Sequence, residues 1–258
     1  MTFPDSQQRF ANRAADYARY RPGYPLEILD VLRTWCNFEP EHSVADIGSG
    51  TGLLAKLFLE NGNRVWGVEP NPEMRSAGEG FLKAFKGFTS VAGSAEATTL
   101  PSDSFDFVAA AQSFHWFDPE PTRREFQRIL KQGGRAIILW NERLTEETAF
   151  LRDYEALLHQ FGTDYDRVNE SYPRAEQMLA FFRPSEFTSH SLPNGQDFDF
   201  EGLRGRLRSS SYVPTPESPQ FAPMMEELQR VFAAHQVNGV VRMEYRTRIY
   251  TGKLKSSG

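Results

Sequence analysis

The stretch VADIGSGTG, from Val44 to Gly52, constrains the fold of this chain more than any other segment. A short apolar run containing Asp46 is followed by glycines at positions 48, 50 and 52. Glycine inside a regular element costs roughly 0.5–1 kcal/mol relative to alanine, so three clustered glycines indicate a geometric requirement. A glycine turn between a strand and a helix N-terminus lets a ligand approach the backbone and its free N–H groups. The stretch therefore predicts a ligand-binding strand–turn–helix unit.

Five short apolar segments predict buried parallel strands. They are Ser43–Ile47, Arg64–Glu69, Phe88–Gly93, Phe105–Gln112 and Arg135–Asn141. Helical spacing follows the first strand from Leu53, and Asn71 with Pro72 can begin a helix after the second. TRREFQRILKQGG predicts an amphipathic helix with a glycine exit before the fifth strand. Alternating strands and helices predict an α/β fold with a doubly wound, mostly parallel, Rossmann-like sheet.

The sequence changes character after Glu142. Residues 145–182 and roughly 221–236 predict helix, and FRPSEFTSHSLPNGQDFDF predicts a break around a short strand. The terminal VVRMEYRTRIYTGKL alternates like a final strand and completes a seven-stranded sheet. We expect residues 1–142 to form an N-terminal cap and the ligand-binding core. Residues 143–239 are expected to add helices over the ligand face, with a short strand, and residues 240–258 to form the final strand and tail.

Composition narrows the class of protein. The net charge of −5 argues against a nucleic-acid partner, because phosphate binding usually needs a basic face. The one cysteine, Cys36, excludes an intrachain disulfide and a thiolate-only metal site, and we expect no metal. No signal-like segment and no run of about 18 apolar residues occurs, so we expect a cytoplasmic protein without membrane contact. No coiled-coil pattern decides between a monomer and a homodimer.

Two common glycine motifs fit the turn badly. A phosphate-binding P-loop would need Gly-Lys-Ser/Thr, which does not follow. A dinucleotide fingerprint beginning at Gly48 and Gly50 would need glycine or alanine at position 53, which is Leu53. A nicotinamide-dependent oxidoreductase is therefore the last-ranked alternative.

The Asp-x-Gly-x-Gly-x-Gly order resembles motif I of the class I S-adenosylmethionine-dependent methyltransferases. Further segments extend the resemblance in order along the chain: VEPNPEM, GSAEATTLP, SFDFVAAAQSFHWFD and RILKQGGRAIILWNE. The opening FANRAADYARYRPGYP is similar to that of small-molecule members, including relatives of trans-aconitate methyltransferase. The resemblance covers residues 10 to about 142 and implies S-adenosylmethionine as the cofactor.

The resemblance also implies roles for individual residues. Asp46 is expected to organise the turn, and Glu69 to bind the ribose, since a carboxylate can accept two hydrogen bonds from a cis-diol. Ser94 stands where the family often has an acidic residue for adenine, so its hydrogen bond would lack charge assistance. The other expected cofactor contacts are Tyr20, Arg21, Gly48, Ser49, Gly50, Gly52, Pro70, Met74, Ala95, Glu96, Ala111 and Gln112. For Tyr20 and Arg21, a simple clamp of an N-terminal helix on the core is an almost equal alternative.

Methyl transfer from a sulfonium requires positioning and desolvation more than covalent chemistry. A carboxylate acceptor needs no general base, whereas a hydroxyl or a carbon acid does. His115 is the candidate base, with packing against Trp116 or a bond to a backbone carbonyl as the structural alternative. The candidate acceptor-binding residues are Trp116, Phe117, Trp140, Asn141 and Tyr212, although large aromatic residues more often belong to a core.

The arginines of LRGRLRSSSYVP suggest an acidic acceptor. On a helix, Arg204 and Arg208 would share one face while Arg206 points elsewhere, and Arg242 or Arg246 could join them. A solvated surface is the simpler interpretation of these charges. The leading prediction is a methyltransferase for a small-molecule acceptor, at an oxygen of an organic acid or hydroxyl.

Two other functions stay open. A nucleic-acid or protein methyltransferase would use the same fold, but no Asn-Pro-Pro-Tyr/Phe signature follows the fourth strand segment. A non-catalytic cofactor-binding protein is the other alternative, and the intact glycines together with Glu69 argue against such decay.

Overall fold

A seven-stranded sheet organises the computed structural model, which describes residues 20–163, 165, 175–183, 185–210 and 212–255. Expectations for residues 10–19 and 166–174 lie outside the described residues. The strand order is β3-β2-β1-β4-β5-β7-β6. The strands are β1 (Ser43–Ile47), β2 (Arg64–Val68), β3 (Phe88–Val91), β4 (Phe105–Ala111), β5 (Leu130–Arg143), β6 (Phe187–Phe198) and β7 (Val241–Lys253).

The first five strands are parallel, and β7 and β6 run antiparallel to their neighbours. This confirms the doubly wound, mostly parallel sheet. The strand order reverses between β1 and β4, and in such sheets ligands bind beyond the carboxyl ends of the strands at that point.

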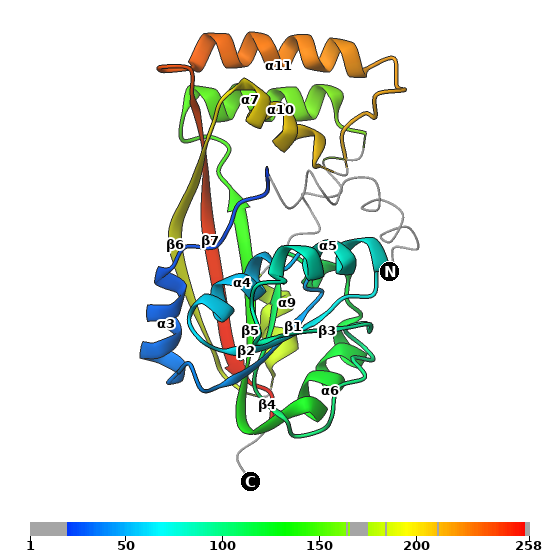
Figure 1. Cartoon of the computed structure of the whole chain (residues 1–258). Helices are drawn as coiled ribbons and strands as arrows, with labels where there is room; N and C mark the ends of the chain where they lie inside the picture. The colour runs from blue at the N-terminus through cyan, green and yellow to red at the C-terminus, as the bar shows by residue number, and fades with distance from the viewer. Residues whose placement is uncertain (1–19, 164, 166–174, 184, 211, 256–258) are drawn as a thin grey trace.

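Helices cover both faces of the sheet (Figure 1). Those in the described part of the chain include α3 (Glu27–Cys36), α4 (Leu53–Glu60), α5 (Pro72–Leu82), α6 (Pro119–Ile129), α7 (Ala149–Phe161), α9 (Ala175–Phe182), α10 (Phe200–Arg208) and α11 (Phe221–His235). On one face, α3, α4 and α5 contribute Leu32, Phe58 and Leu82 to an apolar cluster with the strands. On the other face, α6 and α9 contribute Phe126 and Phe181 to a second cluster.

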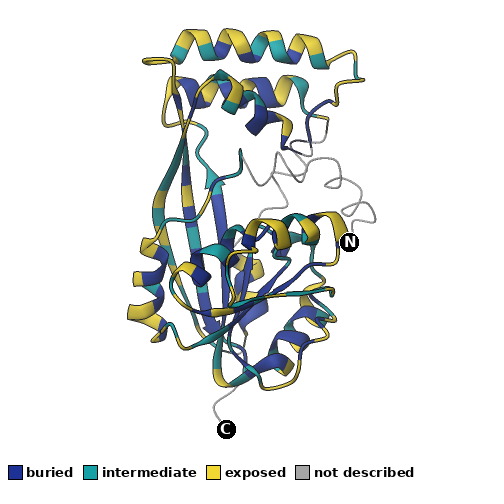
Figure 2. Ribbon diagram, viewed as in Figure 1, coloured by how far each residue is buried: buried dark blue, intermediate teal, exposed yellow. Residues whose placement is uncertain are grey.

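A third apolar cluster lies apart from the first two. It joins α7, α10 and α11 to the ends of β6 and β7, with Leu158, Leu207, Leu228 and Met243 all buried. In Figure 1 these three helices stack above the sheet at the far end of the long β6 and β7 strands. Figure 2 shows that each of them carries both buried and exposed residues, as expected for amphipathic helices.

Two elements differ from the sequence prediction. The helix expected to run to the glycines ends at Ile129, and β5 begins at once at Leu130. The glycines lie instead inside β5, where the pairing with β4 shifts register and Gly133 has a φ of 82°. The strand expected to be short is the twelve-residue β6, which pairs with β7 along its length. Its Pro193 suggests a break in sequence, but proline is tolerated in an edge strand.

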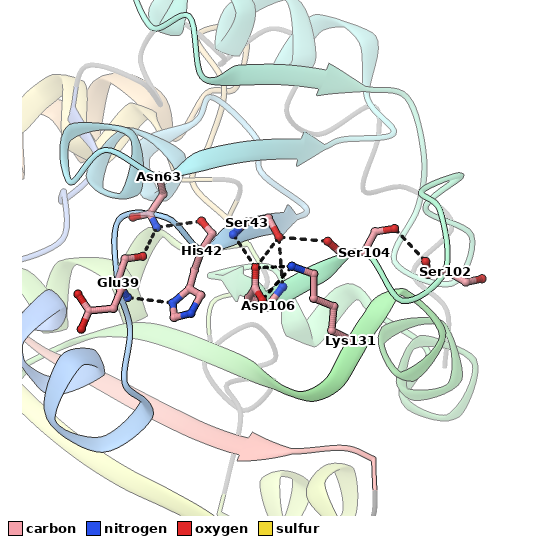
Figure 3. A network of polar contacts seen from close by, with 8 residues as sticks. All are labelled: Glu39, His42, Ser43, Asn63, Ser102, Ser104, Asp106 and Lys131. Atoms are coloured by element: carbon pink, nitrogen blue, oxygen red, sulfur yellow. Dashed lines mark hydrogen bonds and ion pairs between the residues drawn. The ribbon is translucent and has the colours of Figure 1, made fainter.

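Polar contacts close the amino end of the sheet (Figure 3). Asp106 accepts hydrogen bonds from the backbone amide of Ser43 at 2.9 Å, from its hydroxyl at 2.8 Å and from Lys131 Nζ at 2.8 Å. Desolvation opposes ionisation, but the hydrogen bonds from Lys131 and Ser43 outweigh it and lower the pKa of Asp106. Asn63 binds the carbonyls of Glu39 and His42 nearby. Because this end is occupied by structural contacts, the opposite, carboxyl end is the one available to a ligand.

Candidate functional site

A cavity of about 270 Å³ lies at the carboxyl ends of β1, β2 and β4. It is lined by Tyr24, Asp46, Gly48, Ser49, Gly50, Thr51, Leu53, Leu54, Glu69, Pro70, Asn71, Met74, Ser94, Ala95, Glu96, Ala111, Gln112, Ser113, Trp116 and Phe117. The strand ends and loops named in the sequence prediction therefore converge on one space.

The glycine loop after β1 disfavours side chains at two positions. Gly48 has a φ of +66°, and a Cβ there would lie 2.7 Å from Cβ of Ser113. Gly50 has a φ of +55°, and a Cβ there would lie 3.3 Å from Cε of Met74. The amides of Gly48 and Ser49 both donate to the Val68 carbonyl, at 2.8 and 3.1 Å, which holds the loop against β2. The loop thus presents bare, fixed backbone to the cavity.

Gly52 has a different role from the other two glycines. Its φ is +85°, and a Cβ would lie 2.6 Å from Cδ1 of Leu82 in the core. It precedes α4 as the N-cap residue and does not line the cavity. The structure therefore shows a packing requirement at Gly52 where a ligand contact was expected.

Glu69 reaches from the end of β2 into the glycine loop. Its Oε2 accepts the amide of Gly50 and its Oε1 accepts the amide of Asn71, each at 2.9 Å. The residue is 8% exposed, and burial raises its pKa while these two amides oppose the shift. Each carboxylate oxygen has a second lone pair, so the group is held in one orientation and can still accept hydrogen bonds from a ligand.

Asp46 is a buried carboxylate at the base of the cavity. It is 1% exposed, and within the described residues its Oδ2 has no hydrogen-bond partner. Burial raises the pKa of Asp46 to about 7, a hydrogen bond from the Ala55 backbone opposes this, and the Glu69 charge adds to it. A buried, unsatisfied carboxylate oxygen is costly unless a donor or a cation reaches it, so this atom favours a cationic ligand group.

Part of the cavity lining is more apolar. It includes Pro70 and Met74, together with the loop of Ser94, Ala95 and Glu96. Reciprocal backbone hydrogen bonds between Ser94 and Ala97 close this loop. Apolar and backbone groups of this kind suit a flat, weakly polar ring.

Gln112 directly follows β4 and has a φ of +57°. Its side chain hydrogen-bonds both backbone groups of Asn141 on β5, at 3.2 and 3.3 Å. Ser113 follows and donates from its hydroxyl to the Ile47 carbonyl at 3.0 Å. The strand ends of β1, β4 and β5 are thus cross-linked at the cavity.

The described N-terminal segment runs from the upper helices to the cavity. The Tyr20 ring packs so closely on Gly205 of α10 that a Cβ there would lie 2.3 Å from it, and Arg21 Nη2 donates to the Ser209 carbonyl at 3.0 Å. Asn141 and Asn194 both donate to the Gly23 carbonyl. Neither Tyr20 nor Arg21 lines the cavity, whereas Tyr24 does.

His115 lies outside the cavity, contrary to what a general base would require. Its ring packs 4.5 Å from the ring of Trp116 and 5.1 Å from that of Trp140. Burial lowers the pKa of His115 to about 3, so the ring is neutral at physiological pH. The structure therefore places His115 as a packing residue against Trp116, which was the structural alternative to a general base. Trp116 and Phe117 line the cavity, but Trp140, Asn141 and Tyr212 do not and are each 5% exposed.

The sequence prediction missed several residues of the cavity. They are Tyr24, Thr51, Leu53, Leu54, Asn71 and Ser113. Asn71 was recognised only as a helix cap, a role confirmed by its Oδ1 accepting the Met74 amide at 3.0 Å. Thr51, Leu53, Leu54 and Ser113 lie beside the glycine turn or Gln112 in sequence, so closer attention to these neighbours could have found four of the six.

The described ranges contain no group of three or more His, Cys, Asp or Glu residues placed to hold a metal ion. No helix within them combines the length and the apolar character that crossing a bilayer requires.

Comparison with known proteins agrees with this geometry. Residues 45–138 match the family described as a methyltransferase domain. A methyltransferase-like protein of Schizosaccharomyces pombe is 33% identical over 256 residues, covering 95% of this chain and 94% of that protein. An uncharacterized methyltransferase of Mycobacterium tuberculosis is 29% identical over 232 residues, covering 90% and 88%.

The fold has solved counterparts. A structure named as a type II methyltransferase from Anaeromyxobacter dehalogenans has a TM-score of 0.66 at 20% identity, covering 91% of this chain and 98% of that one. A structure named as a methyltransferase from an antibiotic biosynthesis pathway of Anabaena variabilis has a TM-score of 0.61, also at 20% identity, covering 90% and 98%. These structures share the fold. Together with the methyltransferase-domain match, the fission-yeast relative, 33% identical over 95% of this chain, identifies the chain as a member of the class I S-adenosylmethionine-dependent methyltransferases.

Proposed function

We propose that this enzyme methylates an oxygen atom of a small-molecule acceptor, an organic acid in preference to a neutral alcohol. When bound, S-adenosylmethionine supplies a methyl group already activated by the positive sulfonium. The protein then has to bind the cofactor, orient the acceptor and exclude water. In this proposal residues 1–142 bind the cofactor, residues 143–239 provide the acceptor side, and residues 240–258 complete the sheet.

The cavity residues fit the cofactor. A Cβ at Gly48 would clash with Ser113 and one at Gly50 would crowd Met74, so both positions stay bare backbone at the cavity, and Asp46 offers an unsatisfied carboxylate oxygen to a cationic group. Glu69 retains lone pairs for the ribose hydroxyls. For the remaining contacts we propose Ser49 and Gln112 toward the amino-acid portion, and Pro70, Met74, Ser94, Ala95 and Glu96 toward the adenine.

One observation carries the small-molecule assignment: the chain's own N-terminal segment forms part of the cavity wall through Tyr24. The segment from Tyr20 to Tyr24 is anchored on α10 at one end and lines the cavity at the other, with Gly23 tied to Asn141 and Asn194 between them. A macromolecular acceptor would have to displace this segment, whereas a small molecule fits between the cavity and the helical layer. Tyr20 and Arg21 then act by holding the segment in place.

The ionisable groups favour an acid. Among the described cavity-lining residues these groups are Tyr24, Asp46, Glu69 and Glu96, with no histidine, lysine or cysteine. His115 is buried outside the cavity. A carboxylate is already ionised near neutral pH and needs no general base, so it matches a site with these groups.

Cofactor affinity is expected to depend on pH through Asp46. Its pKa of about 7 in the free enzyme means that its proton must be lost before the carboxylate can pair with a cationic ligand. The Kd for S-adenosylmethionine should therefore rise about tenfold from pH 8 to pH 6. Asp46→Asn, titrated by calorimetry over the same range, should bind more weakly and lose this component of the pH dependence. Equal pH profiles for the two proteins would contradict the assignment.

The wild type and Asp46→Asn also allow an independent test through protein stability. Because the folded-state pKa of Asp46 lies above its unfolded value of about 3.8, the folded form binds more protons between these pH values. The free energy of unfolding of the ligand-free wild type should fall relative to Asp46→Asn as the pH rises from about 4 to 7. A relative rise would show that Asp46 is not a buried carboxylate of raised pKa.

Acceptor chemistry can be tested with radiolabelled S-adenosylmethionine and a panel of metabolite acids, alcohols, amines, RNA and protein. We expect label in small acids, in a product that alkali releases as volatile methanol, which is diagnostic of a methyl ester. Asp106→Asn, altered at the closed end of the sheet, is the control for nonspecific loss of fold. Alkali-stable label, label in RNA or protein, or cofactor binding without transfer would each overturn the proposal.

A further inference from the structure

Two arginines lie buried beneath the helical layer, and one of them, Arg143, contacts a carboxylate. Arg143 ends β5 and has a side chain that is 8% exposed. Its Nη2 donates to Glu155 and, at 2.8 Å, to the Tyr165 hydroxyl. Its Nη1 is buried, and no group in the described part of the chain accepts its hydrogen bonds. The Nη1 group of Arg143 is therefore a buried donor that could still bind an acceptor.

Within the part of the chain that the structure describes, the buried Arg206 has no carboxylate partner. It lies on α10 and is 4% exposed. Its Nε donates to the Tyr245 hydroxyl at 3.1 Å and its Nη1 to the Ser210 hydroxyl at 3.0 Å. No described acidic group forms an ion pair with it, and the groups that favour its charged form are tyrosine hydroxyls. A buried charge with no opposite charge costs several kcal/mol, so its presence indicates an anion that completes the site.

The two guanidinium groups converge on Tyr212. Burial by itself would raise the pKa of this phenol, but the positive charges of Arg206, Arg21 and Arg143 outweigh it and lower the pKa. The Tyr154 ring packs on the other side, 5.3 Å from Cζ of Arg143. Aromatic walls with several directed N–H and O–H donors are typical of a pocket that orients an anionic ligand.

Two chain segments connect this cluster to the cofactor cavity, although none of the cluster residues lines the cavity. Arg143 is two residues beyond Asn141, whose backbone is bonded to Gln112 at the cavity, and two strand residues span about 6.6 Å. Arg21 precedes the cavity residue Tyr24 by three positions. A molecule of a few carbon atoms could therefore contact the cluster at one end and the cavity at the other.

We propose that Arg143, Arg206 and Tyr212 bind a carboxylate of the methyl acceptor, and that a different oxygen of the same molecule receives the methyl group. This inference rests on the proposed function. Arginine binds carboxylates through paired, charge-assisted hydrogen bonds, which fixes the orientation of the whole acceptor. A carboxylate neutralised in this way is a poor nucleophile, and neither arginine lines the cavity. The acceptor should thus carry an anchoring carboxylate and a second oxygen nucleophile.

The exposed arginines considered from sequence are already engaged at the surface. Arg204 forms an ion pair with Glu201 at 2.5 Å, and Arg242 forms one with Asp197 at 2.9 Å. Both pairs are solvent-exposed, so they match the simpler interpretation of a solvated face. The arginine of α10 that points away from that face, Arg206, is the one placed to hold an acid.

Binding of a non-reacting acid tests the proposal without turnover. Glutarate and tricarballylate are the probes, with glutaramide as the uncharged counterpart, added to the enzyme saturated with S-adenosylhomocysteine and followed by calorimetry and thermal unfolding. At least one acid should bind to the wild type at least tenfold more tightly than glutaramide. Arg206→Gln, which removes the charge but keeps an N–H donor near the position of Nε for Tyr245, should weaken that binding at least tenfold. Arg204→Gln, on the same helix, should change it less than twofold.

Three results separate this inference from the proposed function. No preference for the acids over glutaramide, or equal acid binding by wild type and Arg206→Gln, would overturn the anchoring site even if methyl esters form. If Arg206→Gln loses stability, Arg143→Gln must reproduce the loss of acid binding with cofactor Kd unchanged. In turnover with an active acid, Arg206→Gln should raise KM at least tenfold with a smaller change in kcat, whereas a purely structural role would lower kcat and cofactor affinity together.

Discussion

Gly48→Ala is expected to weaken binding of S-adenosylmethionine roughly 30- to 100-fold, the largest single effect that we anticipate. An alanine at a φ of +66° costs about 1–2 kcal/mol. Its Cβ would also displace Ser113 and disrupt the hydrogen bond to the Ile47 carbonyl, at about 1 kcal/mol. Without cofactor, the loop of the Gly48→Ala variant can move to relieve this strain. Cofactor binding must then restore the original loop conformation, so the strain appears as a loss of affinity. A total of about 2–3 kcal/mol corresponds to the stated change in Kd.

Gly133→Ala is the matched control for this prediction. Gly133 also has a positive φ, of +82°, but no atom lies within 4 Å of the added Cβ, and the residue is far along β5 from the cavity. It should lose about 1 kcal/mol of stability and keep the wild-type Kd. Calorimetry on both variants, with circular dichroism as the check on folding, decides the matter. A Gly48→Ala Kd within threefold of wild type would refute the close approach of the cofactor to this backbone.

Glu69→Gln is expected to weaken cofactor binding by about one to two orders of magnitude. Hydrogen bonds to a charged acceptor contribute about 1.5–3 kcal/mol each, and glutamine loses the charge while keeping the size. Its NH₂ group would also face the amide of Gly50 or that of Asn71, both of which need an acceptor. A drop in affinity alone would therefore mix a loss of ribose contact with a disturbance of the loop.

A 2′-deoxyribose analogue of S-adenosylhomocysteine separates the two contributions. The wild type should bind the ribose form at least tenfold more tightly than the deoxy form, while Glu69→Gln should discriminate less than threefold. Glu96→Gln is the control, because Glu96 is another carboxylate of the same cavity whose Oε1 accepts the Asp118 amide instead. It should retain the tenfold discrimination. If Glu69→Gln still preferred the ribose form over the deoxy form tenfold, the ribose would not be bound by Glu69.

The core of the fold could be predicted because local signals and tertiary packing agree there. The first four strands are found within about two residues of the segments expected, since each is a buried apolar run bounded by turn residues. Pro193 and Gly195 misled the prediction in β6, because they mark breaks in isolation but are accommodated at a sheet edge. The glycines before β5 misled it similarly, because a register shift in the pairing absorbs them.

The site shows where sequence reasoning reaches its limit. The sequence spacing predicted Gly48, Gly50 and Glu69 at the same edge of the sheet, and the structure places all three at the cavity. It could not distinguish Gly52, whose constraint comes from Leu82, thirty positions away. The buried charge of Arg206 was equally hidden, because its burial depends on β7 and α7 packing against α10 from distant parts of the chain.

The central claim is that the backbone after β1 makes room for the cofactor while Glu69 binds its ribose. A crystal structure of the enzyme with S-adenosylhomocysteine tests it most directly. We predict the nucleoside in the cavity, with the ribose hydroxyls 2.5–3.0 Å from the Glu69 carboxylate, as usual for hydroxyl donors. An empty cavity at saturating ligand, or a ribose held by other groups with Glu69 turned away, would contradict the account.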